Sequence, residues 1–150
     1  MNPQEIENIL HREGLSLAPI SKRLGAFFLD ELLLSLLLIV TFWESFSQAK
    51  TTLESLYVAQ QFSLEYAAIT IIYHTLFVYK YGASLGKIAM RIRVVELPTL
   101  QNPSLLSAFN RAVFRVVSQT LFYLGFVWGV MDPFRRTWHD LSARTIVIES

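Results

Sequence analysis

The feature that most constrains this chain is a run of about twenty residues, Leu24 to Trp43, whose only charged members are Asp30 and Glu31. At ~1.5 Å per helical residue, such a run spans a hydrocarbon core of ~30 Å. Small residues follow it in the manner of a signal-peptide cleavage site, but the run is longer than the apolar part of a typical signal peptide. We therefore predict a membrane helix over 24–43.

The composition indicates that part of the protein is surrounded by an apolar medium, the lipid bilayer, rather than by water. Of the 150 residues, 53% are hydrophobic and 17% are charged, and the mean hydropathy is +0.39. A soluble domain typically carries about 25% charged residues. The composition excludes a disordered chain and a typical soluble enzyme, and the net charge of +1 argues against nucleic acid as a partner. The chain has no cysteine, so it offers no thiolate nucleophile.

Two further apolar segments, over 62–81 and 109–131, bring the expected number of membrane segments to three. Residues 1–20 form a separate N-terminal part, in which Ile6, Ile9 and Leu10 share one face of an amphipathic helix. This helix lies either on the membrane surface or against the rest of the protein. We expect an all-α membrane protein in which residues 21–150 form the membrane domain.

Basic residues in the stretch 82–108 place that stretch in the cytoplasm by the positive-inside rule, together with the N-terminus. The same residues would also attract anionic lipid, but a topological role is the better explanation for them. Within this stretch, β-branched residues at 92–95, matched by others at 145–148, indicate a short cytoplasmic β-pair.

This pairing conflicts with a simple three-span topology, because a third segment that crosses once would put the two strands on opposite sides of the membrane. Two alternatives remain for residues 109–131. Either the segment spans once and the basic tail is exported, or it is re-entrant and turns near Gly125 or Gly129. Basic residues at both ends of the segment favour a cytoplasmic C-terminus.

Ionisable groups at membrane depth cost about 2.5–3.5 kcal/mol each on insertion scales, so each needs a partner or a cavity. Asp30 and His74 each lie about 9 Å from the cytoplasmic end of their segments, at ~1.5 Å per residue. Arg111 and Arg115 are one turn apart on the third segment. We expect them to reach the same layer, where they neutralise Asp30 and Glu31.

This charged cluster has a functional and a structural interpretation. In the first, Asp30 titrates, His74 relays protons and the arginines balance charge. In the second, ion pairs fix the register of the helices, which is the commoner role of buried pairs. Arg23 lies seven residues before Asp30 on the same helix face, so a link within the helix is also available. No catalytic, cofactor-binding or metal-binding residue is expected, because the histidines are scattered and residues 82–87 are one residue short of a phosphate loop.

Three blocks of the sequence carry a family resemblance. The first runs from Arg23 to Asp30, the second from Gly82 to Val95, and the third, after Arg111, from Asp132 to Val147. In this order they resemble the RDD family of membrane proteins over essentially residues 23–148.

The resemblance places the arginine and the two aspartates that give the family its name on Arg23, Asp30 and either Asp132 or Asp140. Asp140 is preferred because it ends an Arg-Thr-x-His-Asp block. Arg144 departs from the family pattern, which usually has glycine there.

The resemblance implies an integral protein of the bacterial cytoplasmic membrane. Some family members have been proposed to exchange alkali cations for protons, and others look like assembly partners in membrane complexes. Three short segments cannot form a pathway alone, so transport requires a homo-oligomer or other membrane proteins. We expect cation or proton movement by an oligomer rather than an enzyme, and a non-catalytic scaffold is the alternative. Both use one cluster: Arg23, Asp30, Glu31, His74, Arg111, Arg115, Asp132 and Asp140.

Overall fold

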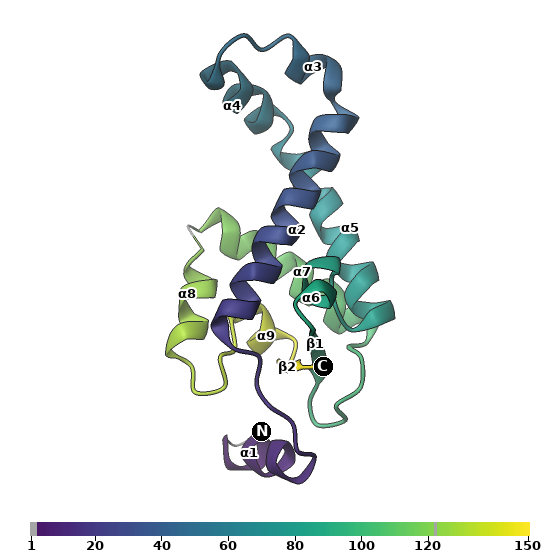
Figure 1. The fold of residues 1–150 in the computed structure, drawn as a ribbon, viewed down its shortest axis with the longest axis vertical. Helices are drawn as coiled ribbons and strands as arrows, with labels where there is room; N and C mark the ends of the chain where they lie inside the picture. Colours follow the sequence, from purple (N-terminus) through teal and green to yellow (C-terminus); the bar gives the residue numbers. More distant parts are fainter. Residues whose placement is uncertain (1–2, 122) are drawn as a thin grey trace.

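The computed structural model describes residues 3–121 and 123–150 and is mostly helical. In chain order its elements are α1 (Pro3–Arg12), α2 (Ile20–Thr41), α3 (Trp43–Ser47), α4 (Thr52–Gln61), α5 (Ser63–Tyr81), α6 (Leu85–Ala89), β1 (Ile92–Glu96), α7 (Leu105–Thr120), α8 (Leu124–Met131), α9 (Trp138–Ser142) and β2 (Thr145–Glu149). The molecule is elongated, with α1 at one end and α3 and α4 at the other (Figure 1). Helix α2 runs between these ends and α5 lies alongside it (Figure 1).

Within the described residues, α2 alone is long and apolar enough to cross a membrane as a single helix. It begins a few residues before the predicted segment 24–43 and matches it otherwise. Two bent pairs pass the same test of length and composition if each pair is one span, so up to three spans are compatible with the fold. The pair α4 and α5 bends by 63°, and α5 matches the predicted segment 62–81.

The third predicted segment, 109–131, is divided into α7 and α8, which are bent by 105°. The turn comes before α8, where Tyr123 has a left-handed backbone with φ 61°. The turn therefore lies near Gly125, as one of the two expected positions has it, and not near Gly129. Both glycines lie inside α8, where a Cβ would come within 2.5 Å of Ser118 Oγ and 2.8 Å of Thr137 Cγ2, respectively. They permit close packing rather than a change of direction.

The predicted β-pair is present. Strands β1 and β2 pair antiparallel, with Ile92 opposite Glu149, and Leu17 forms a further bridge to Ile148. The segment before α2 and both strands therefore lie together in space. Because α7 and α8 are bent against each other, the chain returns to the strand that precedes them, which is compatible with the re-entrant alternative for residues 109–131.

The β-pair is buried on both faces, which explains how two short strands persist, since an isolated pair is marginal in water. On one face, Ile6 and Leu10 of α1 pack against the sheet residues Val95 and Ile146. On the other face lie residues of α2, α5 and α7, such as Ala26. Helix α1 thus buries its apolar face against the protein, which is the second of its two expected placements. Asn2, at the expected start of this helix, lies outside the described residues.

Arg144, the departure from the family pattern, precedes β2 with φ 52°. This is the left-handed backbone that glycine adopts without strain and that costs an L-residue about 1–2 kcal/mol. The turn is therefore kept despite the arginine.

Candidate functional site

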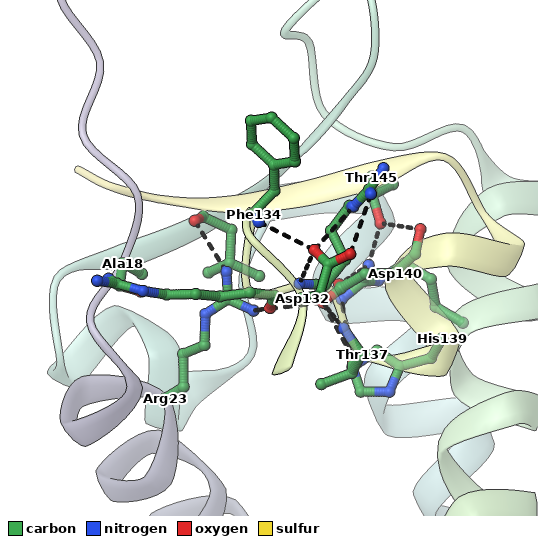
Figure 2. Close-up of polar contacts among 12 residues, drawn as sticks. Ala18, Arg23, Asp132, Phe134, Thr137, His139, Asp140 and Thr145 are labelled. Atoms are coloured by element: carbon green, nitrogen blue, oxygen red, sulfur yellow. Dashed lines mark hydrogen bonds and ion pairs between the residues drawn. The ribbon is translucent and has the colours of Figure 1, made fainter. Parts of the chain in front are cut away.

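The most connected charged group is the carboxylate of Asp140 in α9, which is fully buried. It accepts hydrogen bonds from Arg111 of α7, from Arg23 Nη1 of α2 at 3.3 Å, and from the backbone N–H of Thr137 at 3.0 Å (Figure 2). Burial acts to raise the pKa of this carboxyl group, but the neighbouring positive charges, Arg111 foremost, outweigh it and hold the pKa far below its usual range. Asp140 therefore ties α2, α7 and α9 together as an anion.

The two arginines at Asp140 also bind other parts of the chain. Arg23 donates to the backbone carbonyls of Arg135 and, at 3.2 Å, of Val147 in β2. Arg111 donates to the hydroxyl of Thr145 at the start of β2. Arg23 is engaged in this way, and the link to Asp30 that their spacing on one helix face allows is not formed.

Asp30 in α2 is 1% exposed and is held by neutral groups. It accepts hydrogen bonds from Tyr73 Oη at 2.8 Å, from Ser84 Oγ at 2.6 Å and from the backbone N–H of Gly86 at 2.9 Å. No described cation forms an ion pair with it. The prediction that an arginine neutralises Asp30 is wrong, because the N-terminal turn of α6 supplies N–H and hydroxyl donors in place of a charge. Its neighbour Glu31 is paired instead.

Glu31 accepts from Arg115 Nη2 at 3.2 Å, from Gln119 Nε2 at 2.6 Å and from Tyr66 Oη at 2.5 Å. Of the two expected ion pairs, only this one between Arg115 and Glu31 is formed. The guanidinium of Arg115 also lies 5.0 Å from the ring centroid of Phe27, in a cation–π contact.

A small cavity of about 10 Å³, the size of one water molecule, lies beside Arg111 and Arg115. His74 and His139 line it, as does Lys87. His74 Nε2 and His139 Nδ1 are both buried and have no hydrogen-bond partner in the described chain.

Two groups at this cavity outside the apolar helices have shifted pKa values. Burial lowers the pKa of His139 well below its usual range, so its ring is neutral at pH 7. Burial, aided by the charge of Arg111, also lowers the pKa of the half-buried Lys87 to about 7. Both groups therefore favour the unprotonated form more than they do in water.

A larger cavity of about 530 Å³ lies between α2 and α8. Its lining includes Asp30, Lys87 and Arg115 together with apolar side chains such as Phe28 and Val127. Lys87 and Arg115 thus line both cavities, and Asp30 faces the larger one while His74 faces the smaller.

Asp132 lies apart from this cluster, in the turn that follows α8. It accepts from the backbone N–H groups of Phe134 and Arg136 at 3.0 Å and forms an ion pair with the Arg136 side chain at 3.1 Å. Burial opposes the effect, but the hydrogen bonds from Arg136 lower the pKa of this carboxyl group. Its role is local, and within the described residues its carboxylate shares no partner with Arg23, Asp30 or Asp140.

Several residues of the site were not among the predicted ones. Tyr66 and Tyr73 gave no signal, because tyrosine in a membrane segment is typical of the interfacial belt. Ser84 and His139 lie inside the sequence blocks that resemble the family, so the sequence marks both residues. It does not indicate that Ser84 donates to Asp30 or that His139 lines the small cavity. Within the described residues, no three His, Asp or Glu side chains gather as a metal site.

The fold and the site define a helical, membrane-compatible protein whose apolar helix carries two polar anchors, the half-buried Arg23 and the buried Asp30. The RDD family model matches residues 17–144, so the chain belongs to the RDD family, which is a membrane family. Comparison with curated proteins and with solved structures gives no match.

Proposed function

We propose that this protein exchanges protons for alkali cations across the bacterial cytoplasmic membrane, as an oligomer, with Asp30 as the group that binds the ion. The observation that carries the proposal is the environment of Asp30. It is a buried carboxylate without an ion-pair partner in the described chain, it lines the larger cavity, and the groups that donate hydrogen bonds to it are neutral.

The ligands around Asp30 suit a hard cation. The Tyr73 and Ser84 hydroxyl oxygens contact the carboxylate at 2.8 Å and 2.6 Å, and oxygen ligands of this kind are those that hard cations prefer. A carboxylate at membrane depth favours neutralisation, either by a proton or by a cation. Competition between the two for one carboxylate is the simplest form of exchange.

The proton path of this proposal begins at His74. Its ring is buried, and the unpartnered Nε2 atom belongs to a residue of the water-sized cavity. A single water there would connect His74 with His139 and Lys87. His74 Nε2 forms no hydrogen bond to the described chain, and a proton relay needs a ring nitrogen that is free in this way to exchange a proton with water.

In the membrane arrangement of the proposal, α2 and the α4–α5 pair cross the membrane and the α7–α8 pair is re-entrant, so that the N-terminus and both strands of the β-pair are cytoplasmic. The positive charges of residues 80–93 support this orientation. The second half of α2, from Leu32 to Thr41, has no charged side chain. One chain therefore offers no charged path for an ion across this half of the membrane, and in the proposal several copies assemble to form that path.

A scaffold is the second candidate, and the saturation of Asp140 favours it. Arg23 and Arg111 lock this carboxylate among α2, α7 and α9, which is what a rigid platform for partner proteins requires. In this case the same charges bind helices together and no ion moves.

Flux measurements separate the two candidates. Purified protein is reconstituted into proteoliposomes with a trapped pH dye, and Na⁺, K⁺ or Li⁺ is added outside. The transport proposal predicts cation-dependent proton flux above that of empty liposomes. The absence of such flux for every one of these cations, with folded protein in the membrane, would reject transport and leave the scaffold.

A further inference from the structure

We propose that the cavity between α2 and α8 binds one anionic phospholipid, with its phosphate at Lys87 and Arg135 and an acyl chain along α8. This site is distinct from ion binding at Asp30 and does not depend on transport. The argument rests on charge, on unpartnered donors and on the position of the opening.

The charges of the cavity wall are unevenly paired. Arg23 is bound to Asp140, and Arg115 is bound to Glu31. Lys87 forms no hydrogen bond or ion pair with another described residue. Arg135 binds only the backbone carbonyls of Leu17 and Ala18, at 3.4 Å and 3.2 Å. The cavity therefore contains two basic side chains without a carboxylate partner, and a phosphate in the cavity would favour the protonated form of Lys87 and complement the charge of Arg135.

Buried donors in the same wall also lack partners. The Nε atoms of Arg23 and Arg115 have no acceptor in the described chain, although both atoms are buried and both residues line the cavity. A buried N–H without an acceptor costs about 1–3 kcal/mol, so native proteins rarely leave one. Both atoms are closed off from the cavity in this conformation, so an anion would supply the missing acceptors once the guanidinium groups turn toward it.

The opening of the cavity is apolar. Phe28 of α2 is 67% exposed, and Val127 and Val130 of α8 are 56% and 62% exposed. These three residues line the cavity, and α8 lies beside the first half of α2 (Figure 1). In a bilayer, such surfaces contact lipid chains. A charged floor behind an apolar opening fits an amphiphile whose head group enters between the helices.

The volume and position also suit a lipid. A cavity of about 530 Å³ lies within the usual range of ligand sites, about 300–1,000 Å³. Arg23 begins the apolar part of α2, and Arg135 lies in the turn before α9, so both basic groups stand at the depth of lipid head groups. Asp30 and Asp140 are the opposing negative charges in the wall, but three hydrogen bonds already hold Asp30, and Arg23 and Arg111 pair with Asp140.

Lipid retention tests the proposal. The full chain is reconstituted into vesicles of equal parts phosphatidylglycerol and phosphatidylcholine with identical acyl chains, extracted in mild detergent, and examined by native mass spectrometry. We expect one retained phosphatidylglycerol per chain, and a loss of about tenfold in its retention for the double variant Lys87→Gln with Arg135→Gln. Equal retention of the two lipids would overturn the proposal.

Two further variants keep the result interpretable. Arg93→Gln removes an exposed cation of β1 that does not line the cavity, and it should leave retention unchanged. Val127→Trp keeps every charge and fills the opening with an exposed side chain, so it should reduce retention while the thermal unfolding midpoint is kept. If Val127→Trp retains the lipid fully, or if Arg93→Gln loses it equally, the cavity is not the site.

A soluble head group distinguishes a lipid site from a phosphate site. Glycerol phosphate, added at the same concentration, should not displace the bound phosphatidylglycerol, because it lacks the chain that contacts α8. Efficient displacement would overturn the assignment to a lipid.

Discussion

The backbone N–H of Gly86 donates to Asp30 Oδ1 at 2.9 Å, and this contact joins α6 to the apolar helix α2. It exists because Gly86 has no side chain. A Cβ at this position would lie 2.2 Å from the carbonyl oxygen of Ala26 and 2.8 Å from Asp30 Oδ1. The glycine therefore determines how closely the two elements approach.

The first prediction is that Gly86→Ala destabilises the protein by about 1–3 kcal/mol or more, since backbone must move to relieve the overlap. Thermal unfolding in detergent measures the loss. Gly25→Ala is the matched control, because its Cβ would meet only the flexible end of Met90, at 2.7 Å, which can turn away. A loss for Gly25→Ala as large as that for Gly86→Ala would contradict this account of the α2–α6 contact.

The second prediction concerns the two aspartates of the C-terminal block. Asp140→Asn leaves Arg23 and Arg111 without a buried counter-ion and should cost about 3–5 kcal/mol of unfolding free energy. Asp132→Asn affects a more exposed ion pair with Arg136 and should cost about 1 kcal/mol or less. Denaturant titration of both variants measures the difference. Similar losses in the two would show that Asp140 is not the charge that holds the helices.

The third prediction is a pH dependence from His139. Burial lowers the pKa of His139 in the folded state, so below its ordinary value of about 6.5 the unfolded chain binds a proton that the folded one does not. The neutral form of His139 therefore contributes its full stability above about pH 6.5. The free energy of unfolding decreases as the pH drops below this value, by at most about 1.4 kcal/mol per pH unit. His139→Gln should flatten the decline between pH 7 and pH 5, measured by denaturant titration. His11→Gln, at an exposed position of α1, should leave the slope unchanged.

The fourth prediction concerns the reactivity of Lys87. Because burial lowers its pKa to about 7, its amine is largely unprotonated at pH 8 and should react readily with acetic anhydride. Peptide mass spectrometry across a pH series should show a half-maximal rate near pH 7, with exposed Lys50 as the internal reference. A pH profile identical to that of Lys50 would contradict the environment described for Lys87.

The elements that could be predicted from the sequence are those whose own residues carry a clear pattern, independent of which other element packs against them. Helix α2 follows from the length of its apolar run, and the β-pair follows from two β-branched runs near basic residues. Counting residues also placed Asp30 and His74 correctly inside the fold as buried groups.

The pairing of charges could not be predicted in the same way. Counting gives depth along a helix, but not which side of the helix faces which partner. Arg111 binds Asp140 rather than Asp30 because α9 and β2 fold back against α7, and that contact depends on the bend between α7 and α8. The bend itself carries no proline and falls at Tyr123, not at a glycine. Tyr73 and Ser84 were equally hidden, since their role exists only once α5 and α6 approach α2.

The measurement that tests the central claim most directly is proton flux by Asp30→Asn in proteoliposomes, beside Asp132→Asn and the wild type. Asparagine keeps the size of Asp30 and still accepts from Gly86, and no arginine loses its partner, so the variant should unfold at a midpoint close to that of the wild type. The account predicts that cation-dependent flux vanishes in folded Asp30→Asn and persists in Asp132→Asn. Flux that persists in Asp30→Asn would contradict it.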